Sequence, residues 1–227
     1  MNRQARQSRP QLVCVLADDS NSMRGEKAQA ATDGIRDMLM ECQTKGPKGL
    51  DRSYYQFLLI RFDGEARVDP KCDMTPVRRI DSTEIVLEGT GGMTNITAAI
   101  QLTLDRLRPY MQTLQDHSER AEHPLPLVLL FSDGQHNSKT AQAPHELAAE
   151  LKRLNIDGEP VLVACAGVSL GNKDSVDEEM LRDIASPECY VSIENCSQLT
   201  AFLSAVGSSG ASRAKDIARI ITEQVQE

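Results

Sequence analysis

The segment QLVCVLADDSNSM, residues 11–23, passes abruptly from a hydrophobic run to carboxylates and hydroxyls. Its first seven residues are almost continuously apolar, which is typical of a strand covered on both faces of a parallel sheet. Asp18 and Asp19 follow directly, with Ser20 and Ser22 close behind. Such a cluster is compatible with a helix cap, a phosphatase nucleophile or half of a metal site, and the other segments of the chain discriminate between these readings.

Strand-like and helix-like patterns alternate along the rest of the chain. Further buried strands are expected at residues 54–62, 125–132, 159–167 and 189–193. A polar segment with Pro70, residues 65–74, suits an edge strand. Apolar residues at helical spacing predict helices near residues 28–42, 96–107, 146–154, 177–184 and 197–206. This alternation predicts an α/β fold: a doubly wound, mostly parallel central sheet with helices on both faces, as in Rossmann-like domains.

The length of 227 residues fits one such domain, which we place at residues 11–209. A polar N-terminal tail, residues 1–10, precedes it. The stretch GSSGAS, residues 207–212, is typical of a flexible joint. Within residues 210–227, Ile and Val recur at helical spacing, so that an amphipathic tail helix is expected there.

Composition and charge narrow the range of partners and compartments. The net charge of −8 argues against a nucleic-acid or anionic-membrane partner, because both need a basic surface. No apolar run reaches the ~20 residues needed to span a bilayer, and the N-terminus lacks the apolar core of a signal peptide. The six cysteines are scattered without a Cys-x-x-Cys pair, which predicts free thiols. We therefore expect a cytoplasmic protein.

Three strand-end segments carry hard oxygen donors. The first buried strand runs into Asp18 and two serines, and the third runs into Asp133. Between them, the glycine-rich loop EGTGGMTNIT carries Thr94. Ligands of open parallel sheets bind at the carboxyl ends of the strands, and oxygen donors suit Mg²⁺ better than Zn²⁺. We therefore expect one divalent cation, Mg²⁺ with Mn²⁺ or Ca²⁺ as alternatives, to be held by Asp18, Ser20, Ser22, Thr94 and Asp133.

The combination of Asp-x-Ser-x-Ser, a Thr after a Gly-Gly loop, and Asp-Gly after an apolar strand resembles the metal-ion-dependent adhesion site of von Willebrand factor type A domains. The resemblance covers about residues 11–209. It implies that the three hydroxyls coordinate the metal directly and that the two aspartates act mainly through water. It also implies that a Glu or Asp of a partner protein fills the open coordination position.

Two positions depart from the pattern of that family. Asp19 lies where the family usually has an apolar or small residue. Its side chain could add charge near the metal or point to solvent, and we expect it to point to solvent. Met93 is inserted before Thr94, so that Thr90 and Thr97 are alternatives for the third hydroxyl.

Two further segments, FDGEARVDP and CYVSIENCSQLTAFLSAVGSS, are similar to the bacterial TerY-like subgroup of this family. That subgroup is linked to tellurite-resistance and stress operons. The similarity implies a role in such a system, with a protein kinase or phosphatase encoded nearby as a partner.

Enzymatic readings fit the sequence less well. A haloacid-dehalogenase-like phosphatase needs a second aspartate two residues after the first, where this chain has Ser20. GVSLG matches a nucleophile elbow around Ser169, yet every histidine precedes it, which is the wrong order for that fold. His136, near Asp133, reads as a solvated loop residue. We predict metal-dependent protein binding without catalysis, with a scaffold holding a purely structural metal, or a metal-dependent phosphohydrolase, as alternatives.

Overall fold

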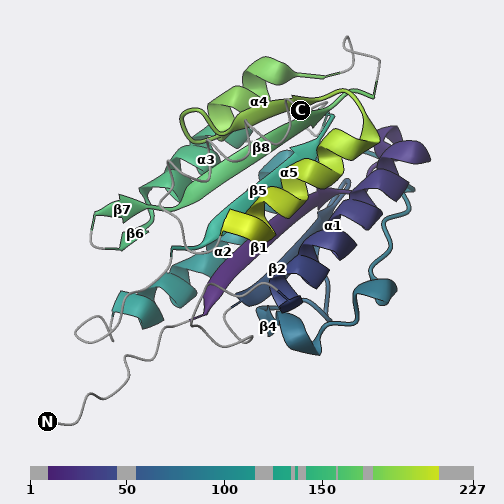
Figure 1. Cartoon of the computed structure of the whole chain (residues 1–227). Coiled ribbons are helices and arrows are strands. Elements are labelled where there is room, and N and C mark those ends of the chain that lie inside the picture. The colour runs from purple at the N-terminus through teal and green to yellow at the C-terminus, as the bar shows by residue number, and fades with distance from the viewer. Residues whose placement is uncertain are drawn as a thin grey trace, which may run out of the picture.

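A seven-stranded sheet runs through the centre of the protein in the computed structural model (Figure 1). The structure describes residues 10–44, 55–115, 125–133, 136–137, 142–156, 158–170 and 176–209. The parallel strands are β1 (Gln11–Asp18), β2 (Tyr55–Phe62), β5 (Leu127–Ser132), β8 (Leu162–Val168) and β9 (Tyr190–Ile193). Two short strands pair antiparallel with β2: β3 (Ala66–Val68) and β4 (Thr75–Pro76).

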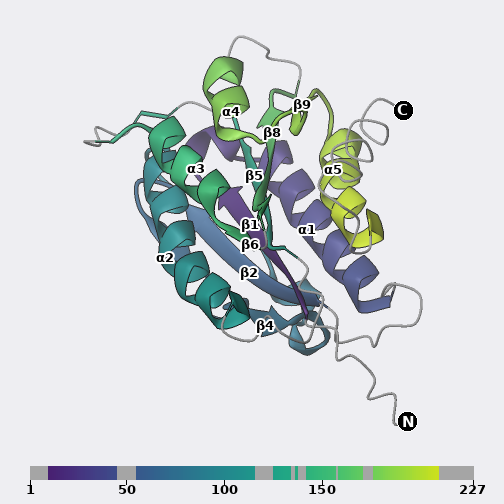
Figure 2. The same ribbon diagram turned by 90° about the vertical axis from the view of Figure 1, so that its left-hand side faces the viewer.

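Helices cover both faces of the sheet, as the alternating pattern predicts (Figure 2). One face carries α1 (Glu26–Thr44) and α5 (Cys196–Ser209). The other carries α2 (Ile96–Gln115), α3 (Pro144–Arg153) and α4 (Glu178–Ile184). Short 3₁₀ turns are η1 (Asn21–Met23), η2 (Val77–Arg79) and η3 (Ser82–Glu84), and a separate hairpin pairs β6 (Asn155–Ile156) with β7 (Glu159–Pro160). The expected α/β class is confirmed.

Between its two ends, from Leu12 to Ala17, strand β1 is apolar because it contributes to two cores at once. Val13 and Val15 pack into the core under α1 and α5, whereas Leu12 and Leu16 pack into the core under α2 and α3. Each of these side chains is at most 1% exposed. Alternate residues of a strand point to opposite faces, so a strand in the middle of a two-sided sheet has no position that tolerates a polar side chain until it ends.

Three expected element boundaries were wrong. The polar edge segment pairs only over Ala66–Val68, and Pro70, which lacks an N–H, lies outside the ladder. The run expected as one strand from residue 159 is divided, because Glu159–Pro160 belong to the β6–β7 hairpin and the central strand begins at Leu162. Helix α5 continues to Ser209, so the first three residues of GSSGAS are helical. The N-terminal tail, except Pro10, and the expected tail helix lie outside the described residues.

All six cysteines are free, as the sequence predicts, with five buried and Cys196 exposed. Within the part of the chain that the structure describes, no helix combines the length and the apolar character that crossing a bilayer requires.

Candidate metal centre

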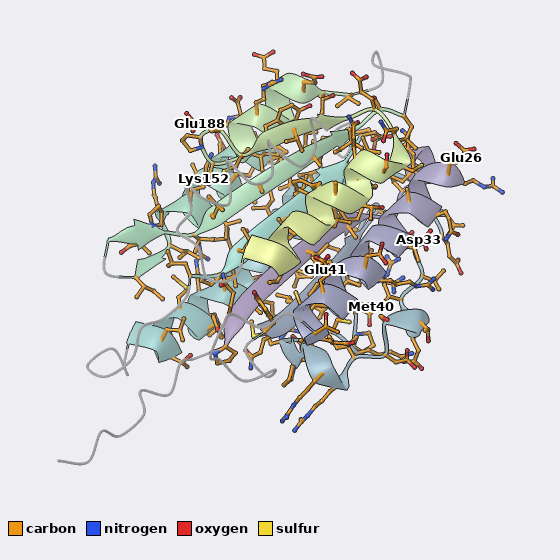
Figure 3. The ribbon with its side chains drawn as sticks, in the orientation of Figure 1. Glu26, Asp33, Met40, Glu41, Lys152 and Glu188 are labelled. Carbon is orange, nitrogen blue, oxygen red and sulfur yellow. The ribbon has the colours of Figure 1, made fainter. Side chains whose placement is uncertain are left out.

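The candidate site lies where the order of the strands switches. Strand β1 pairs with β2 on one side and with β5 on the other, and the chain leaves β1 towards α1 on one face of the sheet. The first turn of α1, where Glu26 is labelled, lies at the carboxyl end of β1 (Figure 3). Asp18 ends β1 and Asp133 directly follows β5, so both carboxylates reach this end of the sheet.

Asp18 is the most constrained of the expected metal residues. It is 1% exposed, and its Oδ1 accepts the backbone N–H of Ser20 at 3.0 Å. Its Oδ2 accepts the hydroxyl of Ser132 at 2.5 Å. Burial raises the pKa of Asp18 to about 6; the hydrogen bonds from Ser132 and Ser20 oppose this rise, and the charge of Asp133 adds to it. The two carboxylates therefore lie close enough to repel each other.

Two of the three expected hydroxyls are already together. Oγ of Ser20 and Oγ of Ser22 are 3.0 Å apart, with Ser20 buried and Ser22 exposed. The N–H of Met23 donates to the carbonyl of Ser20 and closes the η1 turn. Ser20 also forms an isolated bridge with Gly91, which brings the glycine-rich loop alongside this turn.

Thr94, the third expected hydroxyl residue, is 2% exposed and is held by the segment after β5. Its N–H donates to Oδ1 of Asn137 at 2.8 Å, and the N–H of Asn137 donates back to the carbonyl of Thr94 at 3.2 Å. Of the alternatives, Thr90 is exposed, and the hydroxyl of Thr97 donates to the carbonyl of Gln142 at 3.3 Å. Thr94 thus remains the preferred candidate for the third hydroxyl. Sequence reasoning missed Asn137, because nothing in its local pattern marks it.

His136 is partly buried, not the solvated loop residue that the sequence suggested. Its Nδ1 accepts the N–H of Ile96 at 3.3 Å, at the first turn of α2. Burial lowers the pKa of His136, which favours the neutral ring that this acceptor role requires. Together with Asn137, His136 ties the segment after β5 to the start of α2.

The expectation for Asp19 was wrong, because its side chain is only 7% exposed and does not point to solvent. Its Oδ1 accepts the N–H groups of Glu88 and Gly89 at 2.9 and 2.7 Å. Its Oδ2 lies 3.6 Å from a guanidinium nitrogen of Arg67. Its backbone carbonyl accepts the N–H of Gly91 at 3.0 Å. Asp19 therefore holds the glycine-rich loop in place through hydrogen bonds to its backbone.

We expect Asp19→Ala to destabilise the domain by about 2 kcal/mol, because two backbone N–H groups lose their acceptor. Asp19→Asn keeps Oδ1 and should lose less than half as much, since the ion pair with the half-exposed Arg67 is weak. Urea unfolding with EDTA measures both changes, and Mg²⁺ titration calorimetry should rank the variants in the same order. An Asn variant as impaired as the Ala variant would show that the charge of Asp19 matters instead of its hydrogen bonds.

The donor set fits a hard divalent cation. Asp18 and Asp133 are each 1% exposed, and burying two carboxylates side by side is unfavourable without a compensating positive charge. The paired hydroxyls of Ser20 and Ser22 add neutral oxygen donors on the same side. Among the described residues, no group of three or more His, Cys, Asp and Glu side chains forms a metal-binding cluster, so that a site rich in soft ligands is not found there.

The chain belongs to the von Willebrand factor type A domain family, whose model matches residues 12–205. The fold and the strand-end position of the oxygen donors agree with this membership. No curated protein sequence matched the chain.

Solved structures share the fold at low sequence identity. Proximal thread matrix protein 1 from the mussel byssus, in a structure with a zinc-occupied metal-ion-dependent adhesion site, is 19% identical with a TM-score of 0.56, over 88% of this chain and 47% of that one. A von Willebrand factor type A protein from Catenulispora acidiphila is 14% identical with a TM-score of 0.57, over 96% and 43%. The pilus adhesin SpaC from Lactobacillus rhamnosus GG is 14% identical with a TM-score of 0.63, over 94% and 31%. This chain spans less than half of each of these proteins.

Proposed function

We propose that this chain is a metal-dependent protein-binding module that captures an acidic residue of a partner protein. The observation that carries the proposal is the pair of buried carboxylates, Asp18 and Asp133, beside the paired hydroxyls of Ser20 and Ser22. A site built in this way holds two carboxylates, of which, among the described residues, only Asp133 has a lysine ammonium nearby, and it is rich in hard oxygen donors. A divalent cation would compensate the negative charge, and the oxygens would coordinate it.

The expected site residues would hold the ion in two ways. Ser20, Ser22 and Thr94 would hold the ion directly, and Asp18 and Asp133 would hold it through water. When bound, the ion supplies one open coordination position at which a carboxylate of the partner can bind. Mg²⁺ is the cation we propose, with Mn²⁺ or Ca²⁺ as alternatives, because the donors are hydroxyls and carboxylates.

We further propose a bacterial, cytoplasmic setting in a stress or tellurite-resistance-type system, on the similarity to the TerY-like subgroup. The partner would be a protein that presents a Glu or Asp, such as a kinase or phosphatase encoded nearby. An acidic partner is compatible with the net charge of −8, because repulsion is screened beyond roughly 8 Å at physiological salt.

Catalysis is not part of the proposal. Ser169, the residue that matched a nucleophile elbow, is 2% exposed, and its hydroxyl donates to the carbonyl of Ile193 at 3.1 Å. A nucleophilic serine instead needs an exposed oxygen that donates to a base. The hydroxyl of Ser169 therefore serves to join the end of β8 to the end of β9.

Partner capture with and without EDTA tests the proposal. We expect EDTA to release the partner from the tagged protein in a native bacterial lysate. Thr94→Ala should weaken capture by about tenfold or more while the domain stays folded, because one direct ligand is lost. Thr94→Ser keeps the hydroxyl and should restore capture.

Thr113→Ala is the matched control, since it removes an exposed threonine hydroxyl near the other end of α2. Equal capture in EDTA and in Mg²⁺ would overturn the proposal. If EDTA lowered only the melting temperature and left capture intact, the metal would be structural and the chain a scaffold.

A further inference from the structure

Lys27 brings an ammonium group to the candidate metal centre. Its Nζ lies 3.6 Å from Oδ2 of Asp133, and the two side chains are 16% and 1% exposed. Lysine usually keeps its ammonium in water and covers only its alkyl stem, because removing the charge from water is unfavourable. The low exposure of both partners sets this pair apart from an ordinary surface ion pair.

The position of Lys27 on its helix is also unfavourable without Asp133. It is the second residue of α1, and the first turn of a helix carries a partial positive charge that disfavours a cation. Glu26, the residue before it, suits this end of the helix and has an exposed side chain (Figure 3). The attraction to Asp133 is the interaction that offsets the cost of placing Lys27 here.

Arg67, another basic residue near these loops, has different partners. Nη1 of Arg67 lies 2.9 Å from Oδ2 of Asp63, and Nη2 of Arg67 lies 3.6 Å from Oδ2 of Asp19. It supports the glycine-rich loop, whereas Lys27 faces a residue of the expected ligand set. Lys27 is therefore placed to compensate the charge of Asp133 itself.

We propose that Lys27 is an internal counter-cation, which stabilises the metal-free site and lowers its affinity for a divalent ion. The inference rests on the metal site of the proposed function. Asp133 cannot serve both cations fully, and a divalent ion and an ammonium at one carboxylate repel each other strongly at the low dielectric of a buried site. Metal binding and the contact between Lys27 and Asp133 therefore weaken each other.

The proposal predicts opposite effects of one substitution on two measurements. Lys27→Met keeps most of the alkyl stem and removes the charge. We expect it to bind Mg²⁺ about tenfold more tightly in titration calorimetry, because the competing cation is gone. In EDTA, the same variant should melt at a lower temperature than the wild type, because the buried carboxylate of Asp133 loses its ion pair with Lys27.

Lys71→Met is the matched control, since it also removes one lysine charge but from an exposed pair with Glu84. We expect it to change the Mg²⁺ affinity by less than about twofold, since exposed pairs contribute little. Lys27→Arg keeps the charge and should bind Mg²⁺ no more tightly than the wild type. In the wild type, the NMR signals of the Lys27 side chain should shift when Mg²⁺ is added, and this measurement needs no variant to fold.

Equal or weaker Mg²⁺ binding by Lys27→Met would overturn the role of Lys27 and leave the metal site standing. Absence of Mg²⁺ binding by both the wild type and Lys27→Met would overturn the metal site, and the proposed function with it. If Mg²⁺ binding follows the prediction but partner capture is the same with and without EDTA, only the proposed function is overturned.

Discussion

Replacing Asp18 with Asn is expected to abolish divalent-metal binding and to stabilise the metal-free domain by about 3 kcal/mol above neutral pH. The reason lies in the pKa of Asp18, which burial raises from 3.8 to about 6. Asn removes the charge that burial disfavours and keeps the shape of the side chain. Its Oδ1 can still accept the N–H of Ser20, and its amide can donate to the hydroxyl of Ser132.

The pH dependence of this effect has a definite sign. Because the folded pKa of Asp18 lies above its unfolded value, the favourable contribution of the protonated form is fully present below about pH 4. It is lost as the pH rises through about 6, the folded pKa. The stability difference between Asp18→Asn and the wild type should therefore be near zero at about pH 4 and largest above about pH 7.

Urea unfolding in EDTA at several pH values measures this difference, and calorimetry with Mg²⁺ measures the loss of binding. With saturating Mg²⁺ the order of stability should reverse, because ligand binding stabilises only the wild type. An Asn variant less stable than the wild type at every pH would show that the carboxylate of Asp18 is not destabilising in the metal-free protein. Retained Mg²⁺ binding would remove Asp18 from the site.

Gly91→Ala is expected to lower the stability by about 2 kcal/mol and to weaken Mg²⁺ binding by tenfold or more. A Cβ at this position would lie 2.2 Å from Cβ of Asp63. Asp63 cannot easily yield, because its carbonyl accepts the N–H of Asn95 at 2.7 Å and its carboxylate binds Arg67. The loop would have to move away from Ser20, with which Gly91 forms its bridge.

The neighbouring Gly92 offers a matched control, since a Cβ there would meet no atom within 4 Å. Gly92→Ala should leave the melting temperature and the Mg²⁺ affinity close to those of the wild type. Equal effects of the two substitutions would mean that loop entropy matters instead of the contact with Asp63. An unchanged Mg²⁺ affinity in a destabilised Gly91→Ala protein would separate the loop position from the metal site.

The positions of the main strands along the chain and the polar residues at their ends followed from local patterns. An apolar run such as residues 11–17 predicts a strand covered on both faces, and the rule for open parallel sheets then brings Asp18 and Asp133 to one end. The edge strand was predicted too long, because a polar segment lacks the alternation of apolar and polar residues that would mark where strand pairing stops. Asn137 and His136 were not predicted as supports of α2, because their role depends on which loop lies beside them.

The sequence by itself therefore determined the α/β class, the expected position of the candidate site and the chemical type of its donors, since these follow from local patterns in successive strands and loops. Only the tertiary structure decided which groups the charged side chains of Asp19 and Lys27 contact. The partners of Asp19 in the glycine-rich loop are 69 and 70 positions away along the chain. Lys27 lies in α1, whereas its partner Asp133 follows β5. A carboxylate at the end of a strand turns to solvent or inward according to the donors that folding brings to it, because burial is favourable only where those donors are supplied.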